Sequence, residues 1–246
     1  MRMRGWIAGG VAVAIGALAA GGAAQPSRAR VVVSPAPAEP VVVELFTAQG
    51  CAGCPEANRA IEAVADAPGV IALTYAVDYW DYLGWTDTFA RPEFAARQRD
   101  YRAALKLRAL PTPQVILDGA RQAQARPEPL QAAITAEGAR RAPPPQIEFR
   151  ETGDAVGVGS GRPPAGGAEV WAVVFTPGPQ EVEVARGDNR GQTVRHVNVV
   201  RRLTRLGDWT GRPALFRLPG ERAEGEAVAV LVQAKADRRI LTAAVE

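Results

Sequence analysis

The sequence predicts an α/β domain followed by an antiparallel β-sandwich domain. Residues 41–77 read as strand, helix and strand around a Cys-x-x-Cys motif, and a unit of this kind implies two parallel strands that are buried on both faces. After a proline-rich break at residues 142–145, the pattern changes to short apolar or alternating runs separated by Gly- and Pro-rich turns, which is typical of a sandwich. We therefore expect one domain at residues 41–141, a linker at 142–145 and a second domain at 146–246.

The first 24 residues have the pattern of an export signal. Arg2 and Arg4 precede an uncharged apolar stretch, residues 6–24, which ends in small residues as signal peptidase sites do. An uncleaved membrane anchor is the alternative, because the stretch is nearly long enough to span a bilayer, but its many Gly and Ala residues make it weakly hydrophobic. Residues 25–40 contain four prolines and are expected to form a flexible tether.

Export determines which partners we expect. Cleavage removes Arg2 and Arg4, which lowers the formal net charge from +3 to +1, so no electrostatic argument for nucleic-acid binding survives. We expect a periplasmic or secreted protein with no membrane span after cleavage, in an oxidising compartment where a disulfide persists.

After the strand at residues 41–47 and a Gly-containing turn, Cys51 and Cys54 open a predicted helix. Helix N-terminal amides and the helix dipole favour negative charge, so a thiolate on Cys51 would be stabilised, as in redox motifs. Structural zinc would need about four ligands, whereas the chain has two cysteines and one histidine, His196. A c-type haem attachment would need a histidine where Pro55 stands. We expect no metal and no cofactor; a purely structural disulfide stays open, although closing so short a gap constrains little of the unfolded chain.

An aromatic and acidic segment, residues 78–85, follows the apolar strand at 70–77. Because the carboxyl ends of parallel strands meet at one edge of a sheet, we expect this segment beside the cysteines. Core packing under a long loop is one interpretation, and a substrate-facing wall is the other. The candidate binding residues in it are Asp78, Tyr79, Trp80, Asp81 and Trp85.

The remaining elements are predicted from the spacing of apolar residues and from the positions of Pro and Gly. Pro92 is suited to a first helical turn, Thr112-Pro113 precedes a strand that ends at Asp118-Gly119, and residues 127–141 have a helical pattern. The expected strands of the second domain are residues 146–151, 155–160, 170–176, 181–185, 194–203, 214–218, 227–233 and 240–245. His196 lies within one of these runs, and we expect it to be structural.

Several motifs together resemble the secreted bacterial family called domain of unknown function 1223 (DUF1223), which is grouped with the thioredoxin-like proteins. The motifs are Val43-Glu-Leu-Phe-Thr47, Gly50-Cys-Ala-Gly-Cys-Pro55, Val77-Asp-Tyr-Trp-Asp-Tyr-Leu-Gly-Trp85, Arg97-Gln-Arg99, Thr112-Pro-Gln114, Gly187-Asp-Asn-Arg-Gly191 and Asn198-Val-Val-Arg201. The resemblance covers almost the whole mature chain and implies a thioredoxin-like fold for its first domain.

The resemblance also implies site roles. Cys51 would attack, Cys54 would resolve, and Pro113 would be a cis-proline opposite them, with Thr112 offering its backbone to an extended substrate. Thioredoxin keeps a buried acid at the position of Leu45. This chain has an acid one residue earlier, at Glu44, which strand alternation would place on the other face of the sheet. Glu44 is our candidate for proton transfer.

We therefore expect an exported thiol-disulfide oxidoreductase that uses a Cys51–Cys54 disulfide on an envelope substrate, with a protein or a small thiol as redox partner. The alternative is a non-enzymatic binding or adhesion module in which the disulfide only stabilises the scaffold.

The export signal makes a direct prediction. Because small residues end the apolar stretch, the mature protein should start at or near Gln25. Terminal sequencing of exported protein measures this, and recovery of the intact 246-residue chain in the membrane fraction would replace cleavage with anchoring.

Overall fold

The computed structural model describes residues 39–139 and 144–246, which all belong to one compact unit. The expected signal at 1–24 and nearly all of the tether at 25–40 lie outside the described residues, as does the first half of the linker at 142–145. No helix within the described ranges is long and apolar enough to cross a membrane.

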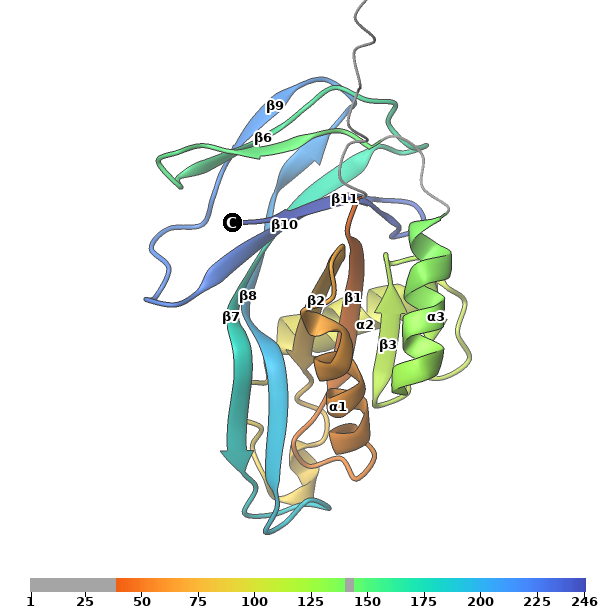
Figure 1. Ribbon diagram of the computed structural model, residues 1–246, viewed down its shortest axis with the longest axis vertical. Coiled ribbons are helices and arrows are strands. Elements are labelled where there is room, and N and C mark those ends of the chain that lie inside the picture. Colours follow the sequence, from red (N-terminus) through yellow and green to blue (C-terminus); the bar gives the residue numbers. More distant parts are fainter. Residues whose placement is uncertain (1–38, 140–143) are drawn as a thin grey trace, which may run out of the picture. The chain divides into compact units, whose positions relative to one another are not determined.

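The predicted strand-helix-strand unit is present. Strand β1, Val41–Thr47, pairs in parallel with β2, Val70–Ala76, and helix α1, Cys54–Ala65, connects them. Both strands are almost entirely buried because helices cover the sheet on each side. Figure 1 shows α1 in front of β1 and β2 and α2, Pro92–Ala104, behind them.

A hairpin extends the sheet beyond β1. Strand β3, Gln114–Leu117, runs antiparallel to β1 and turns into β4, Arg121–Ala123. Helix α3, Pro127–Gly138, then packs beside α1. Apolar side chains from β1, α1 and α3 form one core cluster on this face of the sheet.

The second half of the chain is built from strands. They are β5 (Ile147–Phe149), β6 (Ala155–Val158), β7 (Ala168–Glu183), β8 (Thr193–Trp209), β9 (Ala214–Arg217), β10 (Ala227–Ala234) and β11 (Ile240–Val245). Two runs expected as separate strands, 170–176 and 181–185, form the single strand β7. Shifts in the β7–β8 register, including one between Thr176 and Pro179, accommodate the intervening prolines, so pairing continues past them.

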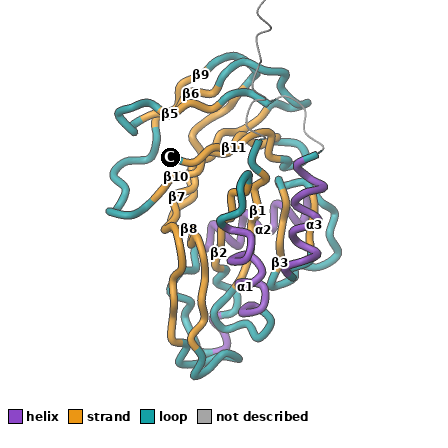
Figure 2. Tube along the Cα trace, viewed as in Figure 1, coloured by secondary structure: helices purple, strands orange, loops and turns teal. Residues whose placement is uncertain are grey.

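The strands form an eight-stranded sheet in the order β11-β10-β7-β8-β2-β1-β3-β4 and a three-stranded sheet in the order β5-β6-β9. The large sheet crosses the expected domain boundary, because β8 lies parallel to β2 at the pair Thr74 and Val199. Figure 2 shows β7 and β8 running side by side past β2 as a long two-stranded hairpin. The fold is thus a mixed α/β architecture with one large and one small sheet, and strands of both expected domains share the large one.

The cores confirm this continuity. On the α2 side, one cluster combines Phe46 and Tyr75 of the first half with Phe175, Leu231 and other residues of the second. A separate cluster joins the small sheet to the far part of the large sheet, and buried Trp209 lies within it.

A buried ion pair joins β1 to α2 and is hydrogen-bonded to a strand of the second half. The Arg97 Nε donates to Glu44 Oε1 at 2.7 Å, and both side chains are almost fully buried. The Tyr101 hydroxyl donates to the other Glu44 oxygen, and Arg97 Nη1 donates to Gln233 of β10 at 3.1 Å. The charge of Glu44 raises the pKa of Arg97 despite the opposing effect of burial.

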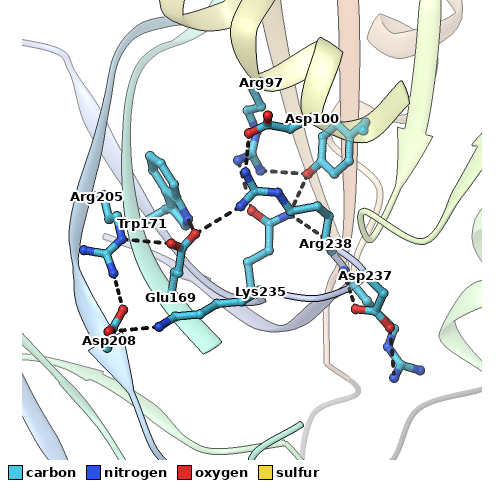
Figure 3. Close-up of polar contacts among 12 residues, drawn as sticks. Arg97, Asp100, Glu169, Trp171, Arg205, Asp208, Lys235, Asp237 and Arg238 are labelled. Carbon is cyan, nitrogen blue, oxygen red and sulfur yellow. Dashed lines mark hydrogen bonds and ion pairs between the residues drawn. The ribbon is translucent and has the colours of Figure 1, made fainter. Parts of the chain in front are cut away.

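More exposed charges continue this network (Figure 3). Arg238 contacts Asp100 of α2 and Glu169 of β7, and Glu169 also accepts from Arg205 of β8 at 2.9 Å. The β10–β11 turn is therefore tied by charge both to the helix and to the neighbouring strands.

The buried pair predicts a large asymmetry between two arginines. Arg97→Ala should lower the free energy of unfolding by about 3–5 kcal/mol, because it leaves Glu44 buried without a countercharge. Arg195→Ala is the matched control, since Arg195 pairs with Glu62 and Glu181 while 45% exposed, and it should leave the free energy of unfolding nearly unchanged. Denaturant titration measures both, and equal small losses would contradict the role given to Arg97.

Candidate functional site

The two cysteines lie at the start of α1. Cys51 belongs to the loop after β1, Gly53 is the N-cap residue, and Cys54 is the first residue of the helix. The cysteines form a disulfide with Cα atoms 5.4 Å apart. Cys51 and Cys54 are only 1% and 0% exposed, whereas the intervening Ala52 and Gly53 are exposed. Ala52 and Gly53, rather than the sulfur atoms, therefore form the surface of the motif.

The structure brings Thr112 and Pro113 to the cysteines. The Thr112–Pro113 peptide bond is cis, as the family resemblance implied. The Thr112 carbonyl oxygen lies 3.8 Å from Cys51 Sγ. A Cβ atom on Gly53 would lie 3.5 Å from Pro113 Cδ, so the proline ring packs directly beside the exposed tip of the motif.

A groove of about 430 Å³ opens on this side of the motif. It passes over Val115 of β3 between the first turn of α1 and the segment leading into α3. Its lining residues are Gly53, Glu56, Ala57, Pro113, Val115, Gln122, Ala123, Gln124, Ala125 and Arg126.

The aromatic segment includes both supporting and exposed side chains. The Tyr79 hydroxyl donates to Gln98 Oε1 at 2.8 Å and shares a short hydrogen bond with the Thr112 hydroxyl. Trp85 Nε1 donates to Gln49 Oε1 at 2.8 Å. Tyr79 and Trp85 thus hold the two backbone segments that flank the sulfur atoms.

Trp80 and Tyr82 form the open part of this segment. Their rings stack with centroids 6.3 Å apart, Trp80 packs partly against the core, and Tyr82 is 78% exposed. The Trp80 carbonyl oxygen faces Gly50. Trp80 therefore contributes to core packing, whereas a substrate-facing role for this segment stays a prediction.

The acidic residues of the segment lead to a carboxyl group that the sequence analysis missed. Asp81 accepts the backbone N–H of Asp87 at 3.1 Å, and Asp87 accepts that of Gln49 at 2.6 Å. Burial raises the pKa of Asp87 from 3.8 to about 6, although hydrogen bonds from Gln49 and Phe89 oppose the shift. The half-buried Asp78 carboxylate has no hydrogen-bond partner within 39–139 and 144–246.

Among the described residues, no hydrogen bond or ion pair joins Glu44 to either cysteine. Its carboxylate points to the α2 side of the sheet, as strand alternation predicted, and Arg97 and Tyr101 occupy its oxygens. Leu45 packs on the α1 side. The geometry therefore supports a structural role for Glu44, and its role in proton transfer stays a prediction without a supporting contact.

A second missed group comes from the turn between β7 and β8. Asn189 is 2% exposed, and its Nδ2 donates to the carbonyl oxygens of Gln49 and Cys51, each at 2.8 Å. The backbone N–H of Asp188 donates to the Gly50 carbonyl at 3.2 Å. The motif at residues 187–191 was visible in the sequence, but its distance along the chain gave no indication of this contact.

His196 is buried near Phe89, with ring centroids 5.5 Å apart, and its ring nitrogens have no hydrogen-bond partner among the described side chains. Burial lowers the pKa of His196 from 6.5 to about 4, so the imidazole is neutral. Within the described ranges, no group of three or more His, Cys, Asp or Glu side chains could hold a metal ion.

Comparisons with known proteins agree with the sequence motifs. The family model described as "Protein of unknown function (DUF1223)" matches residues 42–233. Protein AGR_C_4864 from Agrobacterium tumefaciens has a similar crystal structure, with 32% identity, a TM-score of 0.64 and coverage of 83% of this chain and 92% of that one. HBP35 of Porphyromonas gingivalis is similar in fold alone, with 14% identity, a TM-score of 0.57 and coverage of 85% and 74%. No curated protein matches the sequence.

Two buried groups predict opposite pH effects on stability. Asp87 binds its proton more tightly when folded, so it adds stability as pH falls from about 6 to 3.8. His196 binds its proton more weakly when folded, so it removes stability as pH falls from 6.5 to about 4. As the pH falls from 6 to 4, the free energy of unfolding of Asp87→Asn should therefore decrease more steeply than that of the parent, and that of His196→Phe less steeply. The slopes should differ from that of the parent by at most about 1.4 kcal/mol per pH unit. Denaturant titrations at several pH values measure this, and parallel curves for all three proteins would contradict it.

Proposed function

Because the chain belongs to the DUF1223 family, whose function is unknown, its activity has to be inferred from its site, and we propose that it is an exported thiol-disulfide exchange protein. Cys51 is the attacking thiol and Cys54 the resolving thiol. The observation that carries the proposal is the disulfide at the N-terminus of α1, with Cys51 Sγ beside the carbonyl that precedes cis-Pro113.

The local topology supports a thioredoxin-like interpretation of residues 41–141. Strands β2, β1, β3 and β4 are adjacent in that order, β3 is antiparallel to β1, and the motif opens the helix between β1 and β2. The similarity to HBP35 supports the fold alone. In the second half, the small sheet packs on the large one, which supports a sandwich-like arrangement. The large sheet of this arrangement also contains strands of the first half.

The exchange itself needs two steps. With the pair reduced, the Cys51 thiolate attacks a sulfur of the substrate disulfide, forming a mixed disulfide and releasing one substrate thiolate. Cys54, after losing its proton, attacks Cys51 Sγ, which forms the Cys51–Cys54 disulfide and releases the second substrate thiolate. Two electrons pass from the pair to the substrate, and the reverse sequence oxidises a dithiol. The N-terminus of α1 favours the thiolate in both directions.

The surroundings of the pair suggest how a substrate binds. Thr112 offers backbone groups beside the sulfur atoms, and the groove next to Pro113 accepts an extended segment or a small thiol. Trp80 and the exposed Tyr82 stack and provide an aromatic surface on the segment whose backbone lies near Gly50. Tyr79 and Trp85 act indirectly, since they hold Thr112 and Gln49 in place.

One observation favours the rival proposal, a binding module with a structural disulfide. Both cysteines are almost completely buried, and reactive cysteines are usually partly exposed. The reduction potential separates the two proposals. A structural disulfide should lie below about −300 mV, whereas a working pair should lie between about −120 and −270 mV.

Trapping variants give a test of the exchange proposal. Cys54→Ala should accumulate mixed disulfides with envelope proteins through Cys51, because attack still occurs while the resolving thiol is absent. Cys51→Ala is the matched control and should trap nothing. Non-reducing gels of envelope extract, with identification of the captured proteins, measure the outcome.

Thermal melts of the same variants complete the test. Both variants should lose less than the roughly 2–5 kcal/mol that removal of a structural bridge typically costs in a small secreted domain. If neither variant captures a partner and both melt far below the parent, the disulfide is structural and the exchange proposal fails.

A further inference from the structure

Three consecutive carbonyl groups before and within the Cys-x-x-Cys motif accept hydrogen bonds from one turn. Asn189 Nδ2 bonds the carbonyls of Gln49 and Cys51, and the Asp188 N–H bonds that of Gly50. The turn lies between β7 and β8, well over a hundred residues later in the chain. The loop that carries the attacking cysteine is therefore held at three successive carbonyl groups by the second half of the protein.

Backbone geometry shows that this contact is close. Gly187 has a φ of +84°, and a Cβ atom on it would lie 3.1 Å from the Cα of Gly50. A side chain at position 187 would therefore push the turn away from the cysteine loop. The glycine allows Asp188 and Asn189 to reach the carbonyls.

Other contacts also hold the β7–β8 hairpin to the first half of the chain, so Asn189 is not needed merely to attach this hairpin. Asn198 bridges β2 and β7 by donating to the Ala72 carbonyl at 3.1 Å and accepting the Gly178 N–H at 2.9 Å. Arg195 pairs with Glu62 of α1. The hydrogen bonds given for the Asn189 side-chain amide among the described residues all go to the cysteine loop, and the side chain is buried where water cannot replace them.

We infer that Asn189 is a positioning residue for the Cys51–Cys54 pair. By fixing the carbonyls of Gln49 and Cys51, it keeps the Cys51 sulfur turned toward Thr112 and close to Cys54. Holding two thiols together raises their effective concentration for each other, which favours the disulfide over the dithiol. The inference deepens the proposed function by naming what sets the reactivity of the pair.

The turn also determines the direction of approach. Cys51 presents its carbonyl to Asn189 and its sulfur to Thr112. The Gly187 side of the loop is covered, whereas the Gly53 side opens on the groove beside Pro113. A thiol or disulfide reagent therefore reaches the pair from the Pro113 side.

The test is the equilibrium of the purified, full-length mature protein with glutathione. The protein disulfide and two glutathione thiols give the protein dithiol and one glutathione disulfide, with two electrons transferred. Asn189→Ala should make the disulfide easier to reduce, by about threefold to tenfold in the equilibrium constant, where tenfold corresponds to about 30 mV. Asn189→Ser, a smaller perturbation of the same bonds, should shift it in the same direction by less.

The matched control is Asn198→Gly. It also removes the side-chain bonds of a strand-bridging asparagine, and glycine tolerates the φ of +51° at this position. Thermal melts should show a loss of stability for changes at either asparagine, but only changes at Asn189 should move the glutathione equilibrium. Equal shifts at both positions, or none at Asn189, would overturn the positioning role. The equilibrium needs no physiological partner, so its outcome is independent of whether Cys54→Ala captures a substrate.

Discussion

Two opposite charges meet in the core between β1 and α2, and the arrangement of the surrounding elements depends on satisfying them. Glu44 and Arg97 are buried together, and an isolated charge in this position would cost several kcal/mol. Tyr101 of α2 and Gln233 of β10 complete the hydrogen bonding. The network therefore ties β10, a strand of the second half, to β1 and α2 of the first half.

The same joining of halves reaches the cysteines. Strand β8 adds to the sheet beside β2, which brings the preceding turn over the loop at residues 49–51. The site is thus assembled from three distant parts: the end of β1 with the start of α1, the cis-proline segment before β3, and the turn between β7 and β8. This explains how a small motif can be buried yet remain open on one side, where the groove meets Pro113.

Burial and reactivity have to be considered together at this site. Sulfur atoms that are shielded from water are protected from oxidants in solution, and under the proposed function exchange depends on a substrate that reaches them beside Thr112. The helix N-terminus stabilises a thiolate, whereas the hydrogen bonds of Asn189 favour the closed pair. The balance between these two effects determines whether the disulfide works as a catalyst or as a scaffold bond.

The sequence by itself determined the local elements: β1, α1 and β2 from apolar periodicity, the cysteines at the start of a helix, and the family from its motifs. It also placed Glu44 on the opposite face from Leu45, because side chains alternate along a strand. Only the tertiary structure decided that strands of both halves share one sheet and that Asn189 and Asp87 belong to the site. Periodicity reports which side of an element is buried but not which distant element covers it, since that depends on pairing and packing between residues far apart in the chain.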